Sequence, residues 1–499
     1  MDSPSTNNDA PLRDPSKLFF QKDSLRRSIV ASYWILILLA LPLWWYTTSI
    51  ERLSLPSNRI QQQARNRLQL PITICIESND AGLIRQADQE LSNRITQYRQ
   101  RWKGLDVRVV AVAASSCGSG SDVYMVTPKS GSPTIEKRTL FFPLDEARAP
   151  SRLADTLTSL LVPYTDLSDL EHRVAQYSPR YRLAFSLLNE DATAGDAVLG
   201  WNIQQALKSY VNPVLRRLGP LHNFTIESQV QFHAPLGFTP WQLESVYAIN
   251  PADLTVFVNS ADWTLSSSSS NDPVLHFILF IPSAQRRPLR ILDNDETLTQ
   301  SNAFILPQWG GIVIFNPEKP INGDLPLKDL NVVFSSFARQ MHGLLGVPQL
   351  PSDVGHSGGA SVISDWQLDA LLRRRTLENE AASQDTLLSI IKLVDKIENM
   401  PVKEDVRGDV EGALNALTKM RDSSGKSLKE TFTHSAQSFG LASRAFFSPG
   451  MIALLYFPAE HTYAVYTPLF ASTVIPLFVA ALRETKAWRR ERHAASATT

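Results

Sequence analysis

Two long segments without a charged residue, one near each end, constrain the fold of this chain more than any other feature. The first lies between Arg27 and Glu51 and has 23 residues, and the second, Thr462 to Leu482, has 21. A helix needs about 20 apolar residues to cross the hydrocarbon core of a bilayer. The sequence therefore predicts two transmembrane helices, at residues 28–50 and 462–482.

The flanks of both segments favour membrane spans over the alternatives. The first segment contains Trp44, Trp45 and Tyr46 near its end, and such aromatic rings settle at the headgroup boundary. A cleaved secretory signal has a shorter apolar region that ends at small residues. The second segment is followed by a basic tail, which argues against a buried core helix. It also argues against a removable GPI-attachment signal, because such a signal ends in its apolar segment.

Basic residues also predict the orientation of the chain in the membrane. They precede the first span at Arg13, Lys17, Lys22, Arg26 and Arg27, and they follow the second at Arg483, Lys486, Arg489, Arg490 and Arg492. Only Arg52 lies immediately after the first span. Since positively charged flanks stay in the cytosol, we expect both tails, 1–27 and 483–499, to be cytosolic and the region between the spans to be lumenal or extracellular.

One acceptor triplet for N-linked oligosaccharide, Asn223-Phe224-Thr225, falls within this predicted lumenal region. Such triplets also occur by chance. Asn223 is therefore a candidate glycosylation site, and its use depends on the predicted orientation.

The composition excludes some classes of protein. Lys plus Arg equals Asp plus Glu, 49 each, so the whole chain carries no net charge that would attract nucleic acid. The two cysteines, Cys75 and Cys117, are too few for a disulfide framework and lack the paired spacing of a zinc site. A single bridge between them in an oxidising compartment stays open.

The region between the spans begins with a polar stalk, 51–70, and continues as a first α/β unit, 71–165. Short β-branched apolar runs predict strands, and apolar residues at spacings of three and four predict helices. The expected order is a strand at 71–77, a helix at 80–102, strands at 106–114, 122–128 and 138–144, and a helix at 153–161.

A second unit, 178–346, has a similar order. We expect a strand at 180–191, a helix at 198–218, strands at 224–232, 253–259, 274–282 and 303–316, and a helix at 327–345. A structural duplication is one interpretation of this recurrence, although no repeat is visible residue by residue.

From residue 360 to 447 the apolar residues recur only at spacings of three and four, with breaks at Pro401 and at 422–425. This pattern predicts a helical hairpin or a three-helix array. The expected fold class is thus an α/β lumenal region of two layered strand-helix-strand units plus a C-terminal helical array, flanked by two transmembrane helices.

Candidate catalytic residues are weakly supported. Gly355-His356-Ser357-Gly358-Gly359 matches the G-x-S-x-G motif of hydrolases, but Pro348 and Pro351 exclude the central strand that must lead into such a serine. A linker is the favoured interpretation.

The remaining chemistry-bearing residues point to structure. His342 is expected to be a partly buried core residue of its helix, and Gly310-Gly311 marks a bulge or a close backbone approach. The sequence predicts no catalytic, cofactor-binding or metal-binding residue, and no cofactor.

Three separated stretches carry a resemblance to a known family. They are LPLWWYTTSIERLSLP followed by PITICIE near the N-terminus, LNVVFSSFARQMHGLLGVP at 330–348, and FFSPGMIALLYFPAEHTYAVYTPLFASTVIPLF at 446–478. Together they resemble the PIG-S family, a subunit of the GPI transamidase of the endoplasmic reticulum. The resemblance runs from about Ser24 to Arg483.

This resemblance implies a function. The family's enzyme removes a C-terminal propeptide and joins the new carboxyl end to a GPI lipid, and its catalytic cysteine and histidine belong to a caspase-like subunit. We therefore expect a non-catalytic, scaffolding subunit in the endoplasmic reticulum membrane. Its partners would be the other subunits, with indirect access to the proprotein and the GPI lipid. Two alternatives remain: an independent lumenal hydrolase using Ser357, and a stand-alone lumenal peptide or cargo receptor.

Overall fold

The computed structural model describes residues 23–48, 52–78, 80–112, 117, 120, 122–144, 149–164, 173–193, 196–265, 270–356, 362–397, 400–452 and 459–496. The chain forms two compact units. We call 1–55, 389–409 and 444–499 the spanning unit, and 56–388 and 410–443 the body unit.

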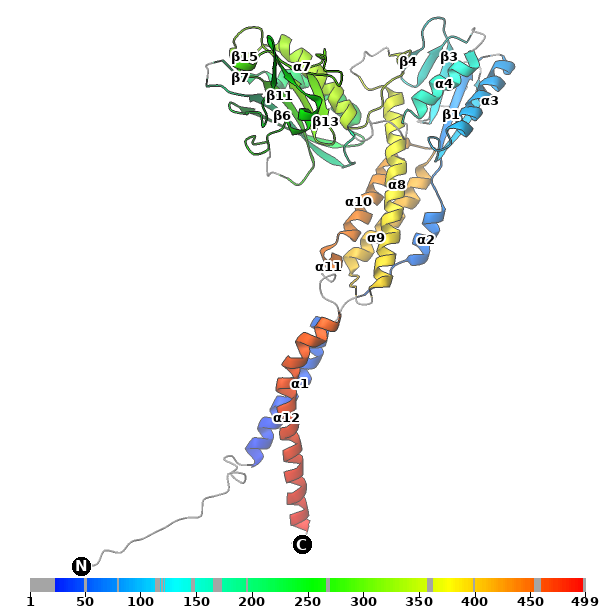
Figure 1. Ribbon diagram of the computed structural model, residues 1–499. Helices are drawn as coiled ribbons and strands as arrows, with labels where there is room; N and C mark the ends of the chain where they lie inside the picture. Colours follow the sequence, from blue (N-terminus) through cyan, green and yellow to red (C-terminus); the bar gives the residue numbers. More distant parts are fainter. Residues whose placement is uncertain are drawn as a thin grey trace, which may run out of the picture. The chain divides into compact units, whose positions relative to one another are not determined.

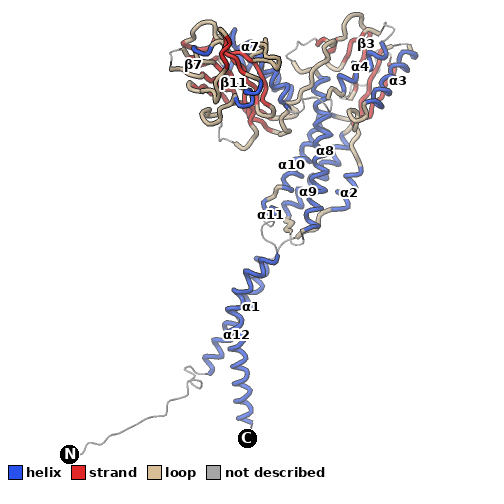
Figure 2. Tube along the Cα trace, in the orientation of Figure 1, coloured by secondary structure: helices blue, strands red, loops and turns tan. Residues whose placement is uncertain are grey.

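The secondary structure is mixed (Figures 1 and 2). The helices are α1 (Asp23–Thr48), α2 (Ser57–Arg65), α3 (Ala81–Gln97), α4 (Ala149–Leu161), α5 (Ile203–Ala206), α6 (Asn212–Leu218), α7 (Leu327–Leu344), α8 (Asp365–Lys396), α9 (Glu404–Ser423), α10 (Leu428–Phe446), α11 (Pro449–Ile452) and α12 (Ala459–Ser496). The strands are β1 (Leu70–Glu77), β2 (Leu105–Val112), β3 (Val123–Pro128), β4 (Thr134–Glu136), β5 (Thr139–Phe142), β6 (Arg180–Asn189), β7 (Ala197–Trp201), β8 (Asn223–Gln231), β9 (Trp241–Leu243), β10 (Val246–Ile249), β11 (Val274–Ile281), β12 (Leu289–Ile291), β13 (Ala303–Leu306), β14 (Gly310–Ile314), β15 (Asn322–Leu325) and β16 (Gly355–His356).

The first sheet of the body unit has the strand order β16-β4-β5-β3-β1-β2. Strand β1 runs parallel to β2 and to β3. Its Ile72, Ile74 and Ile76 alternate onto one face and are buried in one core with side chains of α3 and α4. The strand at 71–77 and the helices near 80–102 and 153–161 are confirmed, while β4 was not predicted.

The second sheet has the order β13-β14-β11-β6-β8, in which β14, β11, β6 and β8 are parallel. From Tyr181 to Asn189 every residue of β6 is buried, as expected for a central strand covered on both faces. Helix α7 covers one face, where Phe334 and Phe337 pack on Phe185. The other face packs on residues of a separate sheet, β12-β10-β9. Since the two main sheets differ in strand order, a duplication is not shown.

Three predicted elements of the second unit are corrected. The prediction of a strand at 253–259 is wrong, because Pro251–Val256 form a 3₁₀-helix. The strand in this region is β10, which ends before that helix. The helix expected from Val198 starts at Ile203, because Ala197–Trp201 form strand β7, which pairs with β15. The Asn202 side chain caps the helix by accepting a hydrogen bond from Gln205 N.

The strand expected at 303–316 is a hairpin of β13 and β14. Gln308 lies in its turn with a φ of 61°, and the two strands run antiparallel from there. The apolar pattern therefore predicted strand structure correctly, but it did not indicate the turn at which the chain reverses.

The C-terminal array consists of α8, α9 and α10, so the prediction of helices in this region is confirmed. The segment expected to be a polar stalk contains α2, which packs on α9. Arg59 Nη2 donates to Asn415 Oδ1 at 3.1 Å, and Gln63 Nε2 donates to Thr418 Oγ1 at 3.4 Å. Ile60 of the same helix is buried. Helix α2 thus belongs to the body unit.

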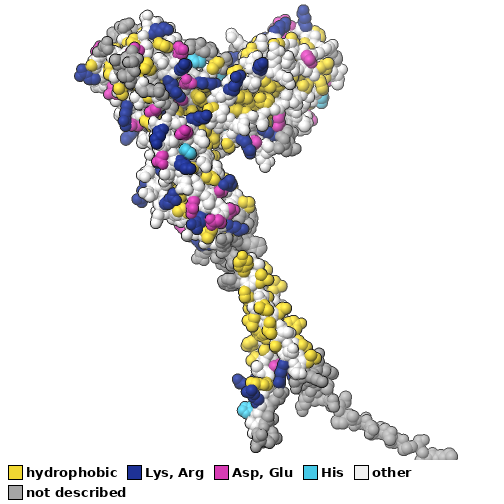
Figure 3. Space-filling model, turned by 180° about the vertical axis from the view of Figure 1, so that it is seen from behind, with side chains coloured by type: hydrophobic (Ala, Val, Ile, Leu, Met, Phe, Trp, Pro, Cys, Tyr) yellow, Lys and Arg dark blue, Asp and Glu magenta, His cyan; other side chains and the backbone are white. Residues whose placement is uncertain are grey.

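Among the described residues, two helices are long and apolar enough to cross a membrane, and both belong to the spanning unit, with candidate spans Ser24–Trp44 and Ala464–Arg490. Their apolar side chains are exposed (Figure 3), which separates them from buried core helices. The Trp44 ring contacts those of Tyr466 and Phe470 at centroid distances of 5.6 and 5.0 Å. Arg26 pairs with Glu484. The two spans therefore pack on each other.

Candidate functional site

Helix α8 has an unusual set of polar side chains that are buried in the body unit. Charged side chains on the exposed face of a helix are common. Within the first twenty residues of α8, however, seven polar side chains are buried: Asp369, Arg373, Arg375, Thr376, Asn379, Glu380 and Ser383. Buried polar groups are costly unless they are hydrogen-bonded, so their partners show what the helix holds together.

Asp369 fixes α8 to the first sheet. Its carboxylate accepts from Tyr124 Oη at 2.8 Å and from Arg138 Nε and Nη2 at 2.7 and 3.0 Å. Arg373 Nη1 donates to the same Tyr124 oxygen at 2.6 Å. Burial raises the pKa of Tyr124, so the phenol stays protonated and donates to Asp369. The Trp366 ring lies 4.4 Å from the Tyr124 ring and covers this cluster.

The same helix contacts the second α/β layer. Arg375 Nη2 donates at 3.4 Å to the carbonyl oxygen of Ala175, which lies in the segment that leads to the central strand β6. Arg217 at the end of α6 pairs with Asp365 and donates from Nε to Ile363 O at 3.0 Å. These bonds place the beginning of α8 against the second sheet and its helices.

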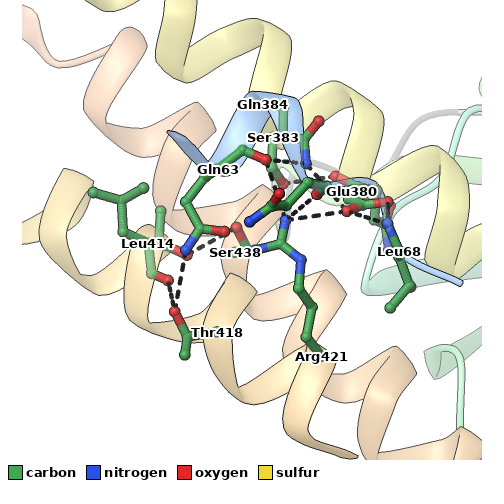
Figure 4. Close-up of polar contacts among 12 residues, drawn as sticks. Gln63, Leu68, Glu380, Ser383, Gln384, Leu414, Thr418, Arg421 and Ser438 are labelled. Carbon is green, nitrogen blue, oxygen red and sulfur yellow. Dashed lines mark hydrogen bonds and ion pairs between the residues drawn. The ribbon is translucent and has the colours of Figure 1, made fainter. Parts of the chain in front are cut away.

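Glu380 connects α8 to the segment that follows α2 and to α9 (Figure 4). Its carboxylate accepts from Leu68 N at 3.0 and 3.2 Å and from Arg421 Nη2 at 3.4 Å. Arg421 Nη2 also donates to Asn66 O at 2.7 Å and Gln63 O at 3.3 Å. Burial raises the pKa of Glu380, and Arg421 opposes this shift. One guanidinium therefore holds the turn after α2 in place.

A cavity of about 760 Å³ lies in the body unit between the two α/β layers and α8. Its wall is mostly apolar, as in ordinary small-molecule sites of this size. It is lined by Pro163, Tyr164, Arg173, Val174, Ile305, Arg339, His342, Gly343, Gly346, Val347, Pro348, Gln349, Leu350, Val354, Gly355, His356, Val362, Gln367 and Arg374. On the face drawn in Figure 3, Lys and Arg side chains border an apolar area of the body unit.

The charged residues of this wall all have one sign. Among the described residues that line it there are three arginines and two histidines, and no Asp or Glu. Arg374 lies over the Tyr164 ring at 4.1 Å and pairs with Glu378 at 2.6 Å. Burial lowers the pKa of His342 to about 4, so its imidazole is neutral near pH 7.

The predicted site residues are dispersed. Ser357 lies outside the described residues, and the two residues before it, Gly355–His356, form the short strand β16 on β4. Cys75 and Cys117 are joined in a disulfide with their Cα atoms 6.3 Å apart, which resolves the open question of their pairing. His342 is partly buried on α7, but it lines the cavity.

Asn223 is the exposed first residue of β8, which is an edge strand of the second sheet. Its backbone N donates to Pro179 O at 2.8 Å, so the main chain is fixed while the side chain faces solvent. Thr225 of the same triplet is also exposed. The geometry is compatible with an oligosaccharide at Asn223.

Sequence reasoning missed both the buried polar face of α8 and the cavity. Within the described ranges, no group of three or more His, Cys, Asp or Glu could hold a metal ion. The polar residues of α8 do recur at helical spacings, but an exposed helix face has the same pattern. Only the partners distinguish the two cases, and Tyr124 is 245 residues from Asp369.

These features define a protein with two candidate membrane spans and a large body whose layers are joined by one helix. The chain belongs to the PIG-S family, phosphatidylinositol-glycan biosynthesis class S protein, which it matches over residues 31–491. The predicted resemblance is therefore confirmed.

Similar proteins are known from animals and fungi. The chain is 30% identical to the human "GPI-anchor transamidase component PIGS", over 91% of this chain and 95% of that protein. It is 29% identical to the Schizosaccharomyces pombe "GPI transamidase component PIG-S homolog", over 94% and 85% of the two chains. It is 25% identical to the Saccharomyces cerevisiae "GPI transamidase component GPI17", over 89% of each.

Proposed function

We propose that this chain is a non-catalytic, scaffolding subunit of the GPI transamidase. It would act in the endoplasmic reticulum membrane, with both tails cytosolic and the body unit lumenal. The family match over 31–491 and the names of the relatives support membership of that complex. The basic flanks of the two spans support the orientation.

The observation that carries the scaffolding role is the buried polar face of α8. Asp369 binds the first sheet and Arg375 the second layer, while Glu380 binds the segment after α2 and helix α9. A buried hydrogen-bonded network favours one arrangement of its elements, because any other arrangement separates the buried charges from their present partners in a medium of low dielectric constant. A body with one fixed arrangement can present constant surfaces to its partners.

Membrane spans add a second physical advantage. They confine the body to the bilayer plane, where a C-terminal signal segment and a lipid donor both reside, and confinement raises the effective concentration of weakly binding partners. In this proposal the chemistry belongs to a caspase-like subunit, and the chain supplies contacts that position it.

The test is recovery of the complex from cells. A tagged full-length chain, purified in a mild detergent, is expected to bring down a caspase-like subunit. The variant Asp369→Asn, which leaves one fewer charge to bind Arg138, is expected to recover less of it, whereas Arg99→Gln on an exposed turn should recover as much as the wild type. A wild-type chain that emerges alone would refute the role.

The orientation has its own test. If the body unit is lumenal, an endoglycosidase should increase the gel mobility of the wild type and leave Asn223→Gln unchanged. Protease added outside sealed vesicles should spare the body unit. Digestion of the body from outside would contradict the topology whether or not Asn223 carries sugar.

A further inference from the structure

The cavity of the body unit has two arginines whose charge none of the described residues neutralises. Arg173 and Arg339 both line it and are exposed. In the part of the chain that the structure describes, neither guanidinium forms an ion pair with a carboxylate, unlike Arg374, which pairs with Glu378. Two like charges facing one cavity repel each other, and a bound anion would relieve that repulsion.

Helix α7 supplies a third polar group at the same place. Arg339, His342 and Gly343 all line the cavity, and their spacing of three and four residues puts them on one face of the helix. His342 Nε2 is buried and has no hydrogen-bond partner among the described residues. A buried polar nitrogen without a partner is costly, and a ligand oxygen could provide the missing bond.

The rest of the wall is apolar and leaves space. It includes Val174, Ile305, Val347, Leu350 and Val354. Gly343 and Gly346 add no side chains to it. The cavity volume of about 760 Å³ suits a ligand of moderate size rather than a single small ion.

Taken together, these features lead us to infer that the cavity is a binding site for a phosphate ester with an apolar remainder. The phosphate lies with Arg173, Arg339 and His342, and the remainder lies against the apolar wall. A planar guanidinium donates two parallel hydrogen bonds to phosphate oxygens, and two guanidinium groups match its double charge better than the single charge of a carboxylate. This inference is independent of the scaffolding role, since neither arginine takes part in the α8 contacts.

The test measures binding to the full-length chain in a neutral detergent by isothermal titration calorimetry. Phenyl phosphate is the main probe, and inorganic phosphate, phenol and benzoate are its matched comparisons. We expect phenyl phosphate to bind about tenfold more tightly than inorganic phosphate or benzoate, phenol to give no signal, and added salt to weaken binding.

Two substitutions locate the site. Arg173→Gln and Arg339→Gln should each weaken phenyl phosphate about tenfold, because each removes a charge-assisted hydrogen bond. Both side chains are exposed, so the thermal unfolding midpoint should not change. Arg99→Gln, which removes an exposed charge away from the cavity, should bind like the wild type.

A second titration, with dioctanoyl phosphatidic acid, distinguishes the source of the phosphate. Tighter binding than phenyl phosphate indicates a lipid headgroup, and weaker binding indicates a soluble phosphate ester. Three results would overturn the proposal: equal affinities for benzoate and phenyl phosphate, no heat of binding with any phosphate probe, or wild-type affinity for phenyl phosphate in both arginine variants.

Discussion

Gly311 lies at a close contact between the second sheet and α7, and replacing it with alanine should destabilise the body unit. A Cβ atom at this position would lie 2.5 Å from Gln340 Cδ and 3.0 Å from Gln340 Cβ. Real carbon atoms do not approach to 2.5 Å, so the Gln340 side chain would have to move. Its Nε2 donates to Phe304 O and Ile312 O, both at 2.9 Å. The same movement would therefore break two hydrogen bonds.

The magnitude follows from these two losses. Each lost hydrogen bond costs about 1 kcal/mol, and overpacking a buried site adds about 1–3 kcal/mol. The expected loss is about 3–5 kcal/mol. For a unit of several hundred residues this corresponds to a fall of about 5–10 °C in the unfolding midpoint.

The assay is thermal unfolding of the full-length chain in mild detergent, followed by tryptophan fluorescence. Gly440→Ala on α10 is the matched control, because a Cβ there has no neighbour within 4 Å. Since alanine favours helix, this control should leave the midpoint unchanged or raise it slightly.

A second substitution tests the cause. Gln340→Ala removes the side-chain atoms that the new Cβ would strike, so the double variant Gly311→Ala/Gln340→Ala should be less destabilised than the sum of the two single variants by about 1 kcal/mol or more. Strict additivity, or a Gly311→Ala midpoint within about 1 °C of the wild type, would refute the reasoning.

Three further predictions concern charge and chemistry. Burial lowers the pKa of His222, His276 and His342 to about 4. Between pH 6.5 and 4 these histidines bind more protons in the unfolded chain, so denaturation midpoints should fall as the pH falls through this window. Glu380→Ala leaves Arg421 and Leu68 N without their acceptor, and should cost about 2–3 kcal/mol in the same thermal assay. Ser357→Ala should preserve GPI anchoring of a reporter protein in cells that lack the wild-type chain, whereas a hydrolase that uses Ser357 would lose activity.

The sequence was sufficient to predict a structural element where one residue pattern dominated its segment. The two uncharged runs correspond to the candidate spans, and strands such as β1 and β11 were recognisable because their apolar runs are short and β-branched. Leu254, Val256 and Val258 alternate like a strand, yet Pro251 begins a 3₁₀-helix and Phe257 is buried in the core. Tertiary packing outweighed the local pattern there.

The candidate site could not be predicted because it depends on convergence in space. Arg173 precedes the second sheet and Arg339 lies on α7, and nothing in either local sequence shows that they line one cavity. The polar face of α8 was visible as a pattern. Its burial was not, since Asp369 and Glu380 meet partners more than two hundred residues away.

The bridge between Cys75 and Cys117 also limits how the chain can associate. These are the two cysteines of the sequence, and each is the other's partner. No thiol is left to form a covalent link to another polypeptide. Any assembly must therefore rest on noncovalent contacts, and after denaturation without a reductant the chain should migrate on a gel as a single polypeptide.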